Sequence, residues 1–286
     1  MKQRVAIVTD SCCELAPDEA ARGNIFIAPA KFAFEQRAVA DGALPWPEFY
    51  ARMAGAEEIP QTFGTSEDDF IAAFEAAFEQ GDEVMCLLTP FDVSPSYTTA
   101  TAAAIGFKAG MVSIENPGIA SAGLGALLLS LADGVAAGWS RTEVAEAIDR
   151  IEPMTETIFV PGSVAWLERS GRLALIEDRL GPIGDRTPVL RAGTRLTGLA
   201  VCESHDAALA RAVALAGARA PDGTALIAVV AHAGAPEAAE RVHQQLAGRW
   251  NIARASTSDL TSTIGSQLGP GAIGIGVAPV AIPEER

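Results

Sequence analysis

The hydrophobic positions in the first half of the chain form short apolar runs that are separated by helical patterns. The strand-like runs cover residues 5–8, 84–88 and 111–114. The helical patterns cover residues 47–53, 70–80, 98–108, 121–137 and 142–151. Short apolar runs that alternate with helices are typical of βαβ units, whose strands pair in parallel. The pattern therefore predicts an α/β fold in which an N-terminal domain has a parallel sheet flanked by helices.

The pattern changes after Glu152-Pro153. Strand-like runs follow at residues 157–160, 189–191, 196–202, 226–231, 252–257 and 272–277, with helical patterns at 163–169, 206–219 and 236–249. The two runs on either side of Gly193 are close enough to form a hairpin, which would bring an antiparallel pair into the sheet. We predict domains over residues 1–153 and 154–286, the second with a mixed sheet and helices, and a ligand cleft between them.

Length and charge narrow the class of protein. The 286 residues exceed the ~250 at which one hydrophobic core stops growing, which favours two domains. A net charge of −15 argues against nucleic acid as a partner, because phosphate contacts need clustered lysine and arginine. The longest apolar stretch, residues 119–131, is shorter than the ~20 residues that span a bilayer, so we expect a buried helix and no stable membrane insertion. The 4 cysteines have no disulfide or zinc spacing, which favours the cytoplasm.

Hydroxyl side chains gather where the predicted strands end. Thr9-Asp10-Ser11 follows the first strand, Thr89 follows the second, and a further loop carries Ser94 and Ser96. In an open parallel sheet, ligands bind beyond the carboxyl ends of the strands. Residues 60–66 precede a helix, and the glycines of residues 265–271 suit a close approach of backbone to a ligand. Each of these segments can equally be a helix cap or a turn.

Signatures of catalysis are scarce. Ser204-His205-Asp206 are neighbours in sequence and cannot all face one another, so we interpret Ser204 as a helix cap. His232 and His243 lack a metal-binding spacing, and there is no phosphate-binding loop or nucleophile elbow. Hydroxyls without a base, metal or cofactor motif indicate binding rather than turnover. The sequence therefore predicts a protein that is not an enzyme, with no catalytic residue, metal or cofactor.

Five segments, taken in order, resemble the DegV family, which includes the fatty-acid-binding subunits of bacterial fatty acid kinase. They are IVTDSCCEL, IPQTFGTS, TPFDVSPSYTTA, FVPGSVAWLERSGRL and IGSQLGPGAIGIG. The resemblance implies a bacterial protein in which two α/β domains hold a long-chain fatty acid. Thr62 and Ser94 match the hydroxyls that bind the carboxylate, with Ser96 beside them, and Gly269 lies in the matching last loop. It also implies a partner kinase that phosphorylates the bound acid, and suggests that Arg169 and Arg172 stabilise the fold or face a partner.

Three positions depart from the family pattern. Gln267 replaces the histidine of the last loop, Pro95 replaces a glycine and removes a backbone N–H, and Phe63 replaces a serine. Because these changes remove donors to a carboxylate, one alternative is the same fold with a different apolar ligand that has a neutral head group. A hydrolase that uses Ser94 or Ser11 is a weaker alternative, since no histidine lies in the matched segments.

Overall fold

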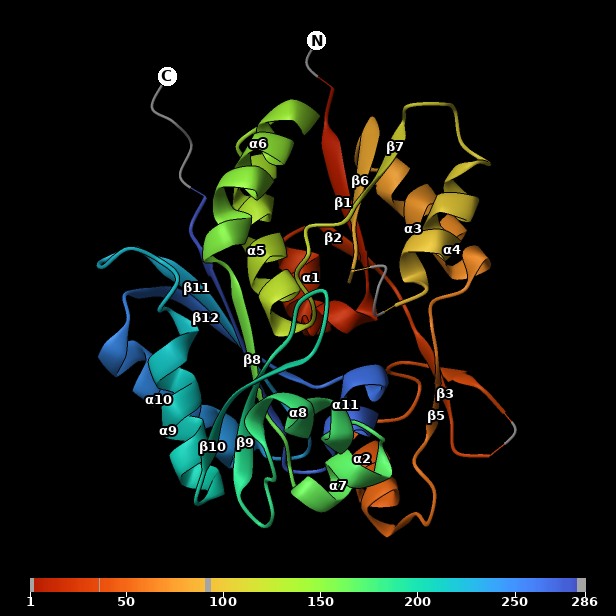
Figure 1. The fold of residues 1–286 in the computed structure, drawn as a ribbon. Helices are drawn as coiled ribbons and strands as arrows, with labels where there is room; N and C mark the ends of the chain where they lie inside the picture. The colour runs from red at the N-terminus through yellow and green to blue at the C-terminus, as the bar shows by residue number, and fades with distance from the viewer. Residues whose placement is uncertain (1–2, 36, 91–93, 282–286) are drawn as a thin grey trace.

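The computed structural model describes residues 3–35, 37–90 and 94–281, and it has the predicted α/β architecture. The residues that it describes form three sheets, shown in Figure 1. Residues 91–93, part of the predicted hydroxyl-rich loop, lie outside the described residues.

The N-terminal half contains a four-stranded, all-parallel sheet in the order β2-β1-β6-β7. Its strands are β1 (Val5–Asp10), β2 (Ile25–Ala28), β6 (Glu83–Leu87) and β7 (Val112–Glu115). Alternate residues of β1 face opposite layers, as the period of two in a strand requires. Ile7 packs with α5 (Ala122–Ala136), and Val8 packs with α3 (Glu67–Phe78) and α4 (Ser96–Ala104). Helices therefore cover both faces of this sheet.

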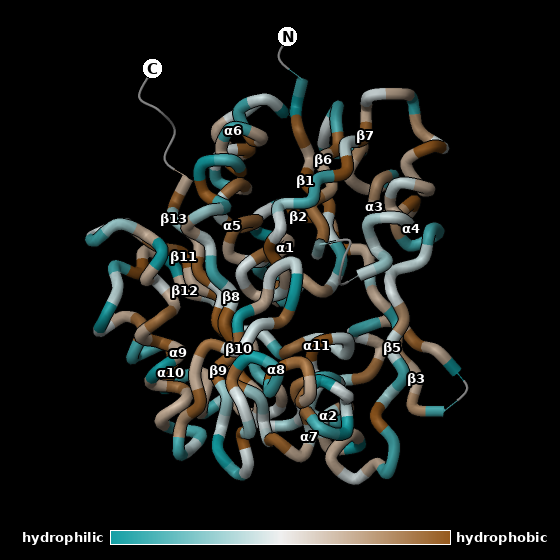
Figure 2. The backbone as a smooth tube through the Cα atoms, viewed as in Figure 1, coloured by the Kyte–Doolittle hydropathy of each residue, from teal (hydrophilic) through white to brown (hydrophobic). Residues whose placement is uncertain are grey.

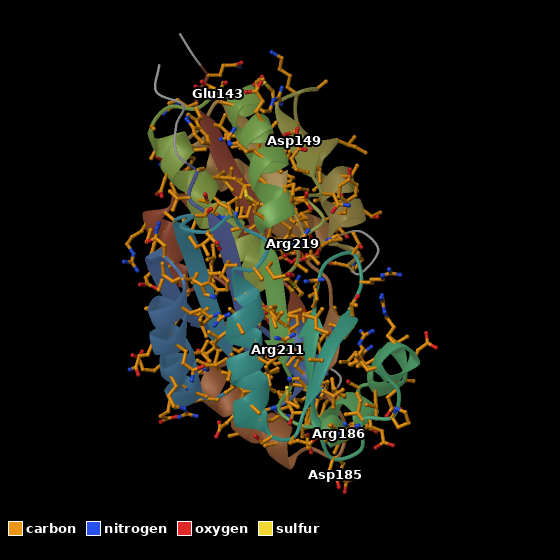
Figure 3. The ribbon with its side chains drawn as sticks, turned by 60° about the vertical axis from the view of Figure 1, so that its left-hand side comes forward. Glu143, Asp149, Asp185, Arg186, Arg211 and Arg219 are labelled. Carbon is orange, nitrogen blue, oxygen red and sulfur yellow. The ribbon has the colours of Figure 1, made fainter. Side chains whose placement is uncertain are left out.

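The C-terminal half contains a six-stranded mixed sheet in the order β10-β9-β8-β13-β11-β12. Its strands are β8 (Glu156–Val160), β9 (Thr187–Arg191), β10 (Thr197–Cys202), β11 (Leu226–His232), β12 (Ile252–Asp259) and β13 (Ile273–Pro279). β9 and β10 form the predicted antiparallel hairpin. Two helices, α9 (His205–Ala216) and α10 (Pro236–Arg249), cover the outer face, and Figure 3 shows them side by side, with Arg211 marking α9.

Helix α5 lies between the two large sheets. Its apolar residues pack against β1 and β6 on one side and against Ile227, Val229 and Ala278 of the mixed sheet on the other. This confirms the buried helix expected over residues 119–131, and Figure 2 shows hydrophobic backbone through this central region. Helix α6 (Arg141–Ile151) follows, with Glu143 and Asp149 labelled on it in Figure 3. Among the described residues, no helix is long and apolar enough to cross a membrane.

The third sheet, in the order β4-β3-β5, is not predicted by the sequence pattern. Its strands are β3 (Lys31–Ala33), β4 (Val39–Ala40) and β5 (Gln61–Phe63), and α2 (Trp46–Gly55) lies between β4 and β5 in the chain. Phe32, Phe49 and Tyr50 from this region share a core with residues of the C-terminal half. The segment 31–63 therefore packs across the proposed division at residue 153, and that division stays a prediction.

Short helices complete the structure: η1 (Ser11–Cys13), α1 (Pro17–Arg22), η2 (Glu152–Met154), α7 (Val164–Arg169), α8 (Leu173–Leu180) and α11 (Ser262–Leu268). Ser163 and Ser204 cap α7 and α9, as predicted, each accepting a backbone N–H bond. The prediction of a glycine-rich loop at residues 265–271 is corrected by the structure, because the first four of these residues belong to α11. A Cβ on Gly265 would lie 2.3 Å from the Tyr50 hydroxyl, so this glycine makes room for a tyrosine rather than a ligand.

Candidate functional site

A cavity of about 490 Å³ opens between the two halves of the chain. Its volume falls within the range of small-molecule sites, ~300–1,000 Å³. The N-terminal half contributes Cys12, Thr89, Ser94 and Ala120, and the C-terminal half contributes residues of β8, α8, the β9–β10 hairpin and α11. Figure 1 shows α8 and α11 lying close to one another below the parallel sheet. This cavity is therefore the candidate for the ligand cleft that the sequence predicts, and the division into two domains stays a prediction.

One part of the cavity wall is polar and contains hydrogen-bonding atoms with no partner. The hydroxyl oxygens of Thr89 and Thr263 and the Nε of Arg172 are buried and, within the described part of the chain, make no hydrogen bond. A buried polar group without a partner costs about 1–3 kcal/mol, so such groups need an explanation. Their convergence on one cavity indicates a place for the polar head group of a ligand.

The rest of the wall combines apolar surface with positive charge. Phe159, Leu175, Leu196, Ile264 and Leu268 supply apolar side chains. Arginines at positions 172, 179 and 195 also line the cavity, with Asp178 as an acidic neighbour. The described cavity wall, which has Gln267 at position 267, therefore presents three cationic side chains. An elongated apolar molecule with an anionic end matches this arrangement.

The predicted site residues separate into two groups. Ser94 and Gln267 line the cavity, from the loop before α4 and from α11 respectively. Ser96 is buried one step behind Ser94, and the two hydroxyl oxygens are 3.1 Å apart. Thr62 pairs with Phe32 in the small sheet, Phe63 is 38% exposed, and Pro95 lies against Gly64. None of these three residues is among the described residues that line the cavity.

Gly269 has a structural reason to be glycine. Its φ is +83°, and a Cβ there would lie 2.4 Å from the Trp166 ring. Trp166 in turn donates a hydrogen bond from its Nε1 to the Ser266 carbonyl at 2.8 Å. The Arg169 guanidinium lies over the Trp166 ring, with its Cζ 4.5 Å from the ring centroid. Arg169 also donates to the carbonyls of Ala56 and Glu57. Arg169 therefore ties α7 to the segment after α2, whereas Arg172 lines the cavity.

Helix α11 carries Thr263, Ile264 and Gln267 to the cavity, and buried acids hold its first turn. Glu14 accepts the backbone N–H of Thr261 at 2.6 Å, and Asp41 accepts the hydroxyl and backbone N–H of Ser262. Both acids come from the N-terminal half, and they accept hydrogen bonds from backbone N–H groups that have no partner within the helix. The sequence pattern gives no sign of this arrangement, because the acids lie more than 200 positions from the helix that they cap.

Glu14 is fully buried, and this burial is the largest cause of the rise of its pKa to about 8, from an ordinary 4.5. Its hydrogen bonds from Thr261 and Ser121 lower the pKa but only partly offset the burial. Glu14 and Ser121 both have positive φ, of 57° and 55°, and the Ser121 hydroxyl donates a hydrogen bond to the Glu14 carboxyl group. Strained non-glycine residues cost about 1–3 kcal/mol each and cluster at functional sites.

The raised pKa of Glu14 predicts a pH-dependent stability. Between pH 4.5 and 8 the folded protein holds a proton that the unfolded chain releases, so stability falls as pH rises. We expect the free energy of unfolding to fall by roughly 2 kcal/mol from pH 6 to pH 8. Urea unfolding at several pH values measures it, and Glu14→Gln should remove most of the slope. Asp82→Asn is the matched control. Hydrogen bonds from Arg4 lower the pKa of Asp82, so this carboxyl group does not titrate between pH 6 and pH 8. An unchanged slope in Glu14→Gln would contradict the assignment.

A metal centre and a serine–histidine pair have no counterpart in the described residues. No group of three or more His, Cys, Asp or Glu side chains among them could hold a metal ion. Of the described residues that line the cavity, none is a histidine. Ser94 instead has another serine, Ser96, as its hydroxyl partner.

Comparison with known proteins assigns the chain to a family. A sequence model described as "Uncharacterised protein, DegV family" matches residues 4–280. The chain belongs to the DegV family. A DegV domain-containing protein of Deinococcus radiodurans is 26% identical over 280 residues, covering 97% of this chain and 99% of that protein.

Solved structures of DegV proteins have the same fold. One from Thermus thermophilus, described as showing fatty acid binding of a DegV family protein, has a TM-score of 0.85 at 24% identity, covering 96% of this chain and 99% of that one. DegV from Bacillus subtilis, described as a fatty acid binding protein, has a TM-score of 0.83 at 21% identity, covering 97% and 99%. A DegV-type architecture over the whole chain confirms the fold that the sequence resemblance implies.

Proposed function

We propose that this protein binds a long-chain fatty acid in the cavity between its two halves. The carboxylate would lie among Thr89, Ser94 and Thr263, within reach of Arg172. The observation that carries the proposal is the set of buried, unpartnered donors on one cavity wall, which a carboxylate would satisfy. Hydrogen bonds to an ionised group are about twice as strong as neutral ones. The alkyl tail would follow the apolar wall, where burial contributes about 0.8 kcal/mol per CH₂.

The described fatty acid binding of related DegV proteins supports this ligand class. We further propose that a partner kinase phosphorylates the bound acid, with this protein acting as the carrier and not as the catalyst. The four cysteines are free thiols, which supports a place in the reducing cytoplasm.

Native mass spectrometry of the purified protein, followed by denaturing extraction, tests the ligand class directly. We expect an adduct that is released as a C14–C20 fatty acid, or uptake of oleate or palmitate by empty protein. A protein that carries no acyl species and takes up neither acid would overturn the proposal. The kinase step is tested separately, by the appearance of an acyl phosphate only when a fatty acid kinase subunit and ATP are added to the loaded protein.

A neutral head group is the second candidate, and Gln267 is the observation that favours it. An amide side chain on the cavity wall can pair with an ester or amide as both donor and acceptor. Replacing Gln267 by histidine should then strengthen fatty acid binding about tenfold below pH 6, where the imidazole is charged. Gln267→Leu controls for loss of the amide alone. Equal oleate affinity for wild type and Gln267→His would remove the reason for this second candidate.

A further inference from the structure

A groove of about 740 Å³ lies outside the cavity of the proposed fatty acid site, and the described residues that line the two are different. Strand β2 is the outer strand at one end of the parallel sheet, and β12 is the outer strand at one end of the mixed sheet. Residues 24–27 and 257–259 line the groove. Because alternate residues of a strand point to opposite faces, consecutive residues line a groove at the edge of the strand. The groove is therefore bounded by two sheet edges that no other described strand covers.

Part of the groove wall is apolar. Leu15, Ala20, Ile25, Ile27 and Trp46 supply apolar side chains. Leu15, Ala20 and Ile25 are buried and belong to the core around α5, whereas Ile27 and Trp46 are half-buried. The volume falls within the range of small-molecule sites, ~300–1,000 Å³, which are lined mainly by apolar side chains. The groove therefore has room for the hydrocarbon part of a small molecule.

The charged groups on the groove wall are all acidic. Asp41 and Asp259 line the groove, and none of its described lining residues is a lysine, arginine or histidine. Asp41 accepts hydrogen bonds from the hydroxyls of Ser11 and Ser262, which are neutral partners. Asp259 has the His232 Nδ1 at 3.5 Å as its ionisable neighbour. Within the described part of the chain, neither carboxyl group forms an ion pair with a lysine or arginine.

The basic residue of β12 is too distant to neutralise these acids. Arg254 lies five residues before Asp259, about 17 Å along an extended strand, and its guanidinium pairs with Glu19 and Asp133. Burial is the largest cause of the raised pKa of Asp41, as expected for a carboxyl group without a cationic partner. The fatty acid cavity, by contrast, has three arginines on its wall. The molecule therefore separates a cationic cavity from an acidic groove.

We propose that this groove is a second ligand site, which takes a small organic cation that joins an ammonium group to an apolar arm. The ammonium group has three N–H donors, and the carboxylates of Asp41 and Asp259 are its acceptors. Hydrogen bonds between ionised groups are about twice as strong as neutral ones. The arm lies along the apolar wall beside Ile25 and Trp46. A net charge of −15 favours the approach of a cation. This site is independent of the proposed fatty acid site, so each proposal can fail without the other.

Isothermal titration calorimetry with octylamine at pH 7.5 tests the head group. We expect wild type to bind one equivalent, and 1-octanol, which has the same tail without the charge, to bind in the groove at least tenfold more weakly. Asp41→Asn and Asp259→Asn should each weaken octylamine binding about tenfold, because each removes one hydrogen bond between ionised groups. Asp178→Asn is the matched control. Asp178 lines the fatty acid cavity and not the groove, so octylamine affinity should equal that of wild type.

Ala21→Trp tests the place of binding without changing either acid. Ala21 lies on α1, lines the groove and is exposed, so a large ring there fills the groove and leaves the core intact. We expect this variant to lose octylamine binding. Because Asp41 also holds Ser262, Ala21→Trp and Asp259→Asn carry the test if Asp41→Asn does not fold.

Four results would overturn the proposal. The first is an absence of octylamine binding to wild type, and the second is binding that persists in Ala21→Trp. The third is equal affinity of wild type and Asp259→Asn, or of octylamine and 1-octanol in the groove, which would mean that the carboxylates do not recognise the charge. The fourth is a loss of affinity in Asp178→Asn, which would place the amine in the fatty acid cavity.

Discussion

Replacing Gly276 by alanine is expected to destabilise the protein by about 4 kcal/mol or more, the size reserved for the most severe core substitutions. Gly276 lies in β13, where α5 begins against the strand. A Cβ at this position would be 1.9 Å from the carbonyl carbon of Ala122 and 2.2 Å from the backbone nitrogen of Gly123. Both contacts are to backbone, which cannot rotate away as a side chain could. The helix would have to move as a body.

Movement of α5 would disturb both halves, because its first turn is held from two sides. Gly123 donates its N–H to the Thr157 hydroxyl at 3.0 Å, and Gly125 lies against the Cys13 carbonyl. Urea unfolding measures the loss, and Gly248→Ala is the matched control. Gly248 lies in the last turn of α10 with open space around its Cα, so alanine there should be neutral or stabilising by about 0.5–1 kcal/mol. A Gly276→Ala protein within 1 kcal/mol of wild type would show that α5 does not rest on the β13 backbone.

The same glycines show how far a sequence predicts a fold. The apolar pattern identifies α5 as a buried helix. It does not reveal why glycine is needed, because the nearest atoms that a Cβ on Gly123 or Gly125 would meet belong to β8 and η1. The pattern of a long, periodic element such as α10 predicts the two ends of the helix that the structure shows. Strand pairs such as β3 and β4, of three and two residues, are too short to carry a period.

The candidate site is predictable only where a local motif marks it. The family-like segments point to Ser94 and Gln267, and both line the cavity, whereas their binding of a ligand stays a prediction. Thr263 gives no signal in the sequence, because it lies just before the glycine-rich segment of residues 265–271 and in none of the family-like segments. In the structure it lies in α11, where Glu14 and Asp41, distant in sequence, accept the N–H groups of Thr261 and Ser262. Long-range capping of this kind leaves no local pattern to read.

A double replacement, Thr89→Val with Thr263→Val, is expected to move stability and binding in opposite directions. In the described part of the chain, the Thr89 hydroxyl oxygen has no hydrogen-bond partner, and the Thr263 hydroxyl oxygen has none that is well formed. The Cys12 thiol beside Thr263 is a weak partner. Valine has the same shape without the polar atom, so the empty protein should gain about 2–4 kcal/mol in its free energy of unfolding. Affinity for oleate should fall about 100-fold, since two hydrogen bonds to the carboxylate are lost.

Thr9→Val is the control that connects the two effects to the cavity. Thr9 also buries an unpartnered hydroxyl, but it lies in β1 and is not among the cavity-lining residues that the structure describes. The Thr9→Val substitution should raise the free energy of unfolding by about 1–2 kcal/mol and leave oleate affinity unchanged. Urea unfolding without ligand and a fluorescence titration with ligand give the two readouts. If the double variant gains stability and still binds oleate as wild type does, the head group lies elsewhere in the cavity. If it loses stability, the two hydroxyls have partners in the empty protein and are not held ready for a ligand.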